Sequence, residues 1–194
     1  MGQLVQAKAS LPATRPPEGA LVTTVASSSA QYLTFSLGGE MFAVGILNVK
    51  EIIEYGHLTE VPMMPAFIRG VINLRGAVVP VVDLAARFGR PPTGVTRRTC
   101  IVILEITDQE SSSDIGILVD SVSEVLEIPS TEIEAPPAFG ARIRTDFIAG
   151  MGKVAGKFVI LLNMGNILSV EEINAWSDAS DLRGNIPALA EMSA

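Results

Sequence analysis

Short apolar runs separated by turn-forming residues are the main pattern along this chain of 194 residues. Between residues 31 and 46, apolar residues alternate with polar ones on both sides of Gly38-Gly39, which supplies the positive φ of a tight hairpin. The run 100–104 is continuously apolar, which is typical of a sheet buried on both faces or of an apolar binding surface. Segments that could form a turn or two of helix are 83–88 and 164–169. The pattern predicts an all-β protein of small barrels with one or two short helices.

The apolar region also resembles itself, since Phe67-Ile68-Arg69-Gly70 reappears as Phe147-Ile148-Ala149-Gly150. The matches that share this offset are Gly76 with Gly156, Val79 with Val159, and Asp83 with Asn163. The matches at other offsets are 49–54 with 122–127, 45–47 with 116–118, and 65–67 with 137–139. The alternative is chance similarity between strands rich in Gly, Phe and Val. We favour two related subdomains packed side by side, with an insertion around 140–146 in the second.

These patterns define the expected domain limits. We expect one ordered domain over residues 31–172, made of subdomains of about 31–95 and 96–172 whose terminal strands could be exchanged between them. Residues 1–30 contain Ser, Thr, Ala and Pro with little periodicity, which predicts a disordered N-terminal arm. The pattern fades after Glu172, so 173–194 is expected to be a loose C-terminal tail.

The two copies differ at one turn. The first copy has Asn73-Leu74-Arg75-Gly76 between its two apolar strands, and the second has Lys153-Val154-Ala155-Gly156. Arg75 therefore has no charged counterpart, whereas Glu51 has one in Glu124. A residue required by the barrel architecture should suit both copies, so Arg75 is the better candidate for a task that one copy performs.

Charge and hydropathy exclude some partners. The formal net charge of −7 and the pI of about 4.7, without a basic stripe, make nucleic acid or an anionic membrane a poor partner. Mean hydropathy is high at +0.40, yet no apolar run reaches the roughly 18–20 residues of a membrane helix, so direct membrane insertion is not expected. The N-terminus has no positively charged region followed by an apolar one, so we expect a cytoplasmic protein.

The sequence shows no catalytic constellation. The sole histidine, His57, lies in an expected loop, and Cys100 lies in an expected strand, so no metal site, nucleophile or cofactor is predicted. Gly150-Met151-Gly152 lies in a predicted hairpin and opens no helix, which excludes a dinucleotide site. Recognition of a partner is the remaining class. The methionine- and proline-rich segment 61–68 could form part of an apolar groove or simply cap the core.

The stretch 65–84, from Pro65-Ala66-Phe67-Ile68-Arg69-Gly70 through Asn73-Leu74-Arg75-Gly76 to Val82-Asp83-Leu84, resembles the signature of CheW-like domains. The resemblance extends over 31–172. It implies two related five-stranded SH3-like barrels and a non-catalytic adaptor between the tips of chemoreceptors and the regulatory domain of the histidine kinase CheA. It also implies a cytoplasmic location, associated with membrane receptor arrays through these partners.

The resemblance implies site residues as well. Glu51 and Arg75 would form a charged pair near a groove that binds the receptor, and Val49, Gly70 and Asn73 match other positions tied to receptor or kinase coupling. A directional contact of this kind would shape the turn, whereas an ordinary exposed pair would contribute only about 0–1 kcal/mol. Two other functions stay open. One is a CheW-like adaptor of a non-flagellar pathway, such as twitching motility, and the other is a small β-barrel module that binds a ligand.

Overall fold

The structure is a computed structural model that describes residues 28–108, 111–136 and 143–168. All of the expected tail and nearly all of the expected arm lie outside the described residues. The first strand, β1, begins at Ser29, two residues before the expected start of the domain.

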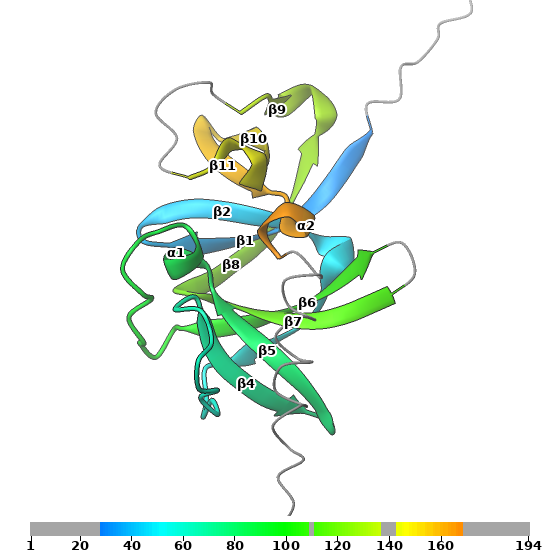
Figure 1. Ribbon diagram of the computed structural model, residues 1–194. Coiled ribbons are helices and arrows are strands. Elements are labelled where there is room, and N and C mark those ends of the chain that lie inside the picture. The colour runs from blue at the N-terminus through cyan, green and yellow to red at the C-terminus, as the bar shows by residue number, and fades with distance from the viewer. Residues whose placement is uncertain (1–27, 109–110, 137–142, 169–194) are drawn as a thin grey trace, which may run out of the picture.

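Two twisted β-sheets, stacked on each other, make up the described part of the chain, as predicted for an all-β fold of two SH3-like units (Figure 1). The second barrel is a six-stranded sheet in the order β8-β1-β2-β11-β10-β9: β8 (Ser121–Pro129), β1 (Ser29–Leu37), β2 (Glu40–Gly45), β11 (Lys157–Leu162), β10 (Ile148–Val154) and β9 (Ile133–Glu134). The first barrel is a five-stranded sheet in the order β3-β6-β7-β5-β4: β3 (Val49–Glu54), β6 (Cys100–Asp108), β7 (Ser111–Val119), β5 (Ala77–Asp83) and β4 (Ile68–Leu74). The short helices are α1 (Leu84–Arg87), α2 (Met164–Ile167) and the 3-10 turns η1 (Ile46–Asn48), η2 (Ser130–Glu132) and η3 (Thr145–Phe147).

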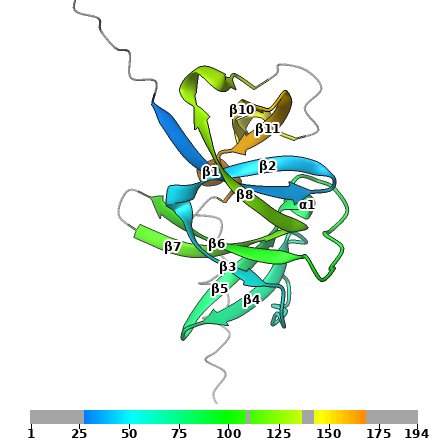
Figure 2. The same ribbon diagram turned by 180° about the vertical axis from the view of Figure 1, so that it is seen from behind.

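Neither barrel is an uninterrupted stretch of chain. Strands β1 and β2 pair with β8 and β11 of the second barrel, while β6 and β7 complete the first barrel beside β3 and β5. A single boundary at 95/96 therefore does not separate the two sheets. Figures 1 and 2 show the second barrel in the upper half of the molecule and the first barrel in the lower half.

The central strands of the two sheets bury one face against each other. In β6, Val102 and Leu104 point into this shared core, while Ile101 and Ile103 point into the small core of the first barrel. Both faces of β6 are therefore buried, which explains the continuous apolar run at 100–104. The shared core collects buried residues of both barrels, among them Leu33, Phe35, Leu37, Phe42, Val44, Ile115, Ile117 and Val119.

The repeat inferred from the sequence is present in the structure. The β4–β5 and β10–β11 hairpins are equivalent, and Asp83 and Asn163 cap the short helices that follow them. Strands β3 and β8 are also equivalent, and both carry a bulge, next to Glu51 in one and Glu124 in the other. The bulge in β8 is held by the hydroxyl of Thr34, which donates to Glu124 O and accepts from Glu124 N.

One of the proposed matches is wrong. Gly116 pairs with Val81, and the counterpart of Val81, Leu161, pairs with Ala43. Ala43 is therefore the counterpart of Gly116, two residues before Gly45, because similar apolar strands can be aligned in more than one register. The match of 65–67 with 137–139 lies partly outside the described residues.

The helix caps give a test of the asymmetry between the copies. The buried carboxylate of Asp83 accepts hydrogen bonds from Ala85 N, Ala86 N, Thr93 N and Thr93 Oγ1, whereas Asn163 Oδ1 accepts one from Asn166 N at 3.3 Å. We expect Asp83→Ala to lower the free energy of unfolding by roughly 2–4 kcal/mol, because the donors of Thr93 would stay buried without an acceptor. The matched variant Asn163→Ala should cost about 1 kcal/mol or less. Urea unfolding measures both, and equal losses would contradict this account.

Candidate functional site

Arg75 and Glu51 form an ion pair at one end of the first barrel. Arg75 lies at the tip of the β4–β5 hairpin, and Glu51 lies beside the bulge of β3. Arg75 Nη2 donates to Glu51 Oε2 at 2.7 Å. Since β3 and β4 are the two edges of the five-stranded sheet, the pair connects edges that the backbone ladder leaves apart. The contact that the sequence analysis expected is present.

The exposure of this pair limits its contribution to stability. The side chain of Arg75 is 81% exposed and that of Glu51 is 24% exposed. An ion pair with one member in solvent contributes about 0–1 kcal/mol to folding, since water and salt screen it. Arg75 engages Glu51 through a single donor nitrogen, and the exposed guanidinium can offer its other N–H groups to a partner.

The turn that carries Arg75 has the same backbone in both copies. Arg75 and Ala155 have φ of 53° and 48°, and each is followed by a glycine with positive φ. The turn itself therefore does not require arginine. In the first copy Asn73 Oδ1 accepts a hydrogen bond from Gly76 N at 2.8 Å, which braces the turn. Asn73 thus positions the tip from which Arg75 projects.

Position 70 requires glycine because the chain passes close to it where the barrel closes. It is buried, has φ of 144°, and a Cβ there would overlap the carbonyl oxygen of Thr59. Thr59 and Val71 exchange two backbone hydrogen bonds, of 2.9 and 2.8 Å, that attach the segment before β4 to the sheet. The counterpart Gly150 is also closely packed, since a Cβ there would lie 2.7 Å from Ile133 Cγ2 and 3.2 Å from Glu134 O of β9, but its φ is not positive. Any effect of Gly70 on coupling would act through the barrel backbone.

Val49 also has a structural explanation. It begins β3, pairs with Leu104 and packs half-buried against the shared core. Its counterpart Val122 packs against the same core from β8. The residue type therefore suits both copies, and Val49 sets the position of β3 just before the bulge at Glu51.

Exposed apolar side chains accompany the ion pair, and the sequence analysis did not single them out. Leu47, in the turn before β3, is 95% exposed, and Val78, near the hairpin tip, is 71% exposed. Ile52 of β3 is exposed as well. Edge strands and hairpin tips leave one face uncovered, which explains why these apolar side chains are exposed. The segments that hold Glu51 and Arg75 thus combine charge with apolar surface.

Lys50 adds a second charged contact on β3. Its Nζ lies 2.7 Å from Asp114 Oδ1 and 3.1 Å from Glu105 Oε1. The hydrogen bond to Asp114, followed by the one to Glu105, raises the pKa of Lys50 above its ordinary value. Hydrogen bonds from Ser112 and then Lys50 lower the pKa of Glu105. Lys50 therefore forms its ion pairs with residues of β6 and β7, whereas Glu51 forms its ion pair with Arg75.

The methionine-rich segment lines an open cleft of about 600 Å³ on the first barrel. Met64, Pro65 and Ile68 form part of its wall, and Met63 is 84% exposed. Glu60 and Arg69 also line the cleft, so its wall is not purely apolar, and a role of 61–68 in binding stays a prediction. His57 also borders the cleft and is exposed, as expected of a loop histidine. Within the described ranges no cluster of three metal-ligating side chains occurs, and no helix is long and apolar enough to cross a bilayer.

Comparisons with known proteins agree with this fold. The CheW-like domain model matches residues 31–172. Chemotaxis protein CheW of Klebsiella aerogenes is 34% identical over 143 residues, which cover 74% of this chain and 84% of that protein. Chemotaxis protein CheW of Bacillus subtilis is 29% identical, over 86% of this chain and 98% of that protein. The crystal structure of scaffolding protein TtCheW from Thermoanaerobacter tengcongensis superposes with a TM-score of 0.66 at 34% identity, covering 74% of this chain and 90% of that chain.

The match over residues 31–172 and the two-barrel all-β fold together define the class of protein. The chain belongs to the CheW-like family.

Gly70 provides a test of barrel closure. We expect Gly70→Ala to lower the free energy of unfolding by roughly 2–4 kcal/mol, because the new Cβ must displace the backbone at Thr59. Gly56→Ala, in the loop that follows β3, has open space around its Cβ and no positive φ, so its effect should stay within about 0.5 kcal/mol. Chemical denaturation measures the free energy of unfolding of both variants. A Gly70→Ala protein as stable as Gly56→Ala would refute the closure role.

Proposed function

We propose that this protein is a non-catalytic adaptor that couples chemoreceptors, the methyl-accepting chemotaxis proteins, to the histidine kinase CheA in a bacterial chemosensory array. The observation that carries this proposal is the family match over the complete two-barrel domain. It is supported by the TtCheW structure, which is described as a scaffolding protein. Binding to the receptor tip and to the regulatory domain of CheA would let receptor state control the kinase.

We place the receptor contact on the first barrel, at Glu51 and Arg75. Arg75 is exposed, is not required by its turn, and has no charged counterpart in the second barrel, where Ala155 takes its place. Exposed Leu47, Ile52 and Val78 lie on the same two segments and can accept the apolar face of a helix, which is the expected form of a receptor tip. Val49, Gly70 and Asn73 contribute indirectly, by holding β3, the barrel closure and the turn in place.

The location follows from the proposed partners. The protein would act in the cytoplasm and reach the membrane-bound array through receptor and kinase, with no membrane insertion of its own. The formal net charge of −7 is consistent with protein partners and makes nucleic acid an unsuitable one.

A second candidate is a CheW-like adaptor of a non-flagellar chemosensory-type pathway, such as one controlling twitching motility. It is favoured by a match to Protein FrzA of Myxococcus xanthus, 29% identical over 78% of this chain and 92% of that protein. The two candidates share the same binding chemistry and differ in the output of the kinase. Identification of the receptor and kinase genes beside this one would separate them.

Direct binding tests the adaptor function. Calorimetry with the cognate CheA regulatory domain and, separately, with a cytoplasmic receptor fragment should detect complexes with dissociation constants in the micromolar range, roughly −8 kcal/mol. Absence of binding to both partners at tens of micromolar, about −6 kcal/mol, would count against the adaptor function. It would favour the alternative of a barrel module that binds a small ligand.

Arg75 tests the location of the receptor contact. We expect Arg75→Ala to weaken binding of the receptor fragment about tenfold, or roughly 1.4 kcal/mol, because a charged hydrogen-bonding group is lost from the interface. The unfolding free energy should change by less than about 1 kcal/mol, since the ion pair is largely exposed. Lys153→Ala, at the base of the equivalent turn in the second barrel, is the matched control and should bind normally. A collapse in stability of Arg75→Ala would point to a structural role instead.

The asymmetry of the barrels gives a stricter test. Ala155 has the turn conformation of Arg75, and Glu124 is the counterpart of Glu51, so Ala155→Arg can be introduced without changing the turn. In the Arg75→Ala background we expect Ala155→Arg not to restore receptor binding, because the second barrel is not the proposed receptor surface. Recovery of wild-type affinity in the same calorimetric assay would show that the barrels are interchangeable.

A further inference from the structure

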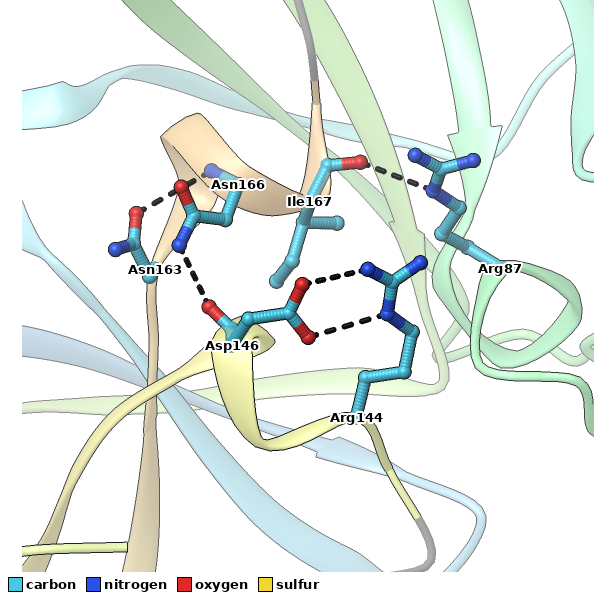
Figure 3. Close-up of polar contacts among 6 residues, drawn as sticks. All are labelled: Arg87, Arg144, Asp146, Asn163, Asn166 and Ile167. Carbon is cyan, nitrogen blue, oxygen red and sulfur yellow. Dashed lines mark hydrogen bonds and ion pairs between the residues drawn. The ribbon is translucent and has the colours of Figure 1, made fainter.

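Arg87 lies where the two equivalent short helices meet. Helix α1 follows β5 of the first barrel and α2 follows β11 of the second, so Arg87 and Ile167, the last residues of the two helices, are counterparts. Nε of Arg87 donates a hydrogen bond to Ile167 O at 3.0 Å (Figure 3). Arg87 therefore binds the backbone of its own counterpart in the other barrel.

The guanidinium of Arg87 also contacts an aromatic ring from each half. Its Cζ lies 4.4 Å from the ring centre of Phe67 and 5.7 Å from that of Phe147. Each ring is attached to its own barrel, since Phe67 O accepts a hydrogen bond from Asp83 N and Phe147 O accepts one from Asn163 N. One side chain thus connects two equivalent points on the two barrels.

The position of Arg87 is fixed by its neighbour in the chain. Phe88 is buried in the shared core, with its ring centre 5.9 Å from that of Phe42 and 6.0 Å from that of Phe147. Apolar packing of this kind holds the barrels together but has little directional preference. The hydrogen bond and the cation–π contacts of Arg87 depend on direction and distance, so they can select one angle between the barrels.

Arg144 offers an internal comparison. Its Cζ lies 4.8 Å from the ring centre of Phe147, and its guanidinium binds both carboxylate oxygens of Asp146, at 3.1 and 2.7 Å. Asp146 O in turn accepts a hydrogen bond from Asn166 Nδ2 at 2.7 Å (Figure 3). These contacts join η3 to α2 within the second half of the chain. Arg144 is thus the same residue type on the same ring, but its bonds to Asp146 do not cross between barrels.

We propose that Arg87 is a positioning residue that sets the angle between the two barrels. If the protein is an adaptor, a fixed angle would hold partners bound to different barrels in a defined relative orientation. Only this consequence depends on the proposed function. The angle itself is a property of the isolated chain.

Distance measurements on the full chain test this proposal without any partner. Nitroxide labels are attached at Glu54→Cys in β3 and Lys153→Cys in β10, both exposed, in a Cys100→Ser background. Double electron–electron resonance should give one narrow distance distribution. Arg87→Met keeps an apolar stem but loses both directional contacts, so we expect the narrow peak to be lost and a broader, shifted distribution to replace it. Arg87→Lys keeps a cation and a donor and should retain the narrow peak.

An unchanged distribution in Arg87→Met would overturn the proposal, whatever the melting temperature of that variant, and would assign Arg87 to stability alone. If Arg87→Met fails to fold, Phe67→Leu removes the ring beneath the guanidinium while keeping apolar volume. That variant should also broaden the distribution, and a wild-type result would again overturn the proposal. Loss of partner binding in the calorimetric assays would not affect any of these outcomes.

Discussion

The contact between β1–β2 of the second barrel and β6–β7 of the first is the constraint on which the rest of the structure depends. Each of these strands buries one face in the shared core and turns the other toward the core or mouth of its own barrel. Strands of this kind need apolar residues at consecutive positions, not only at alternate ones. This requirement accounts for a mean hydropathy of +0.40 in a protein of two small barrels.

The same contact makes the two barrels one folding unit. The first strands of the chain complete the second barrel, and β6 and β7 complete the first, so either barrel cut from the chain would lack central strands. The bulges next to Glu51 and Glu124, the glycines at 70 and 150, and the capped helices after β5 and β11 occur at equivalent places. Against this shared framework the differences stand out: Arg75 where the other copy has Ala155, and Arg87 where it has Ile167.

Much of the fold and part of the site could be predicted from the sequence. The hairpins and the repeat depend on local patterns and on motifs that recur within the chain. The pairing of Glu51 with Arg75 was expected only from the resemblance to CheW-like domains. The match of Gly45 with Gly116 was wrong by two residues, because alternation alone does not select a register between similar strands. Leu47 and Val78 were not identified as surface residues, because the exposure of an apolar side chain in a strand-like segment depends on which parts of the sheet stay uncovered.

The sequence by itself determined the strands, their turns, the glycines that permit close backbone approach, and the residues that differ between the copies. These features follow from backbone sterics and apolar periodicity, which act over a few residues. Only the tertiary structure decided which strands share a sheet, and in particular that β1 and β2 join β8 and β11. It also decided that Arg87 of one barrel forms a hydrogen bond with Ile167 of the other. Such contacts join residues far apart in the chain, and their geometry is set by how two curved sheets pack, which no local pattern encodes.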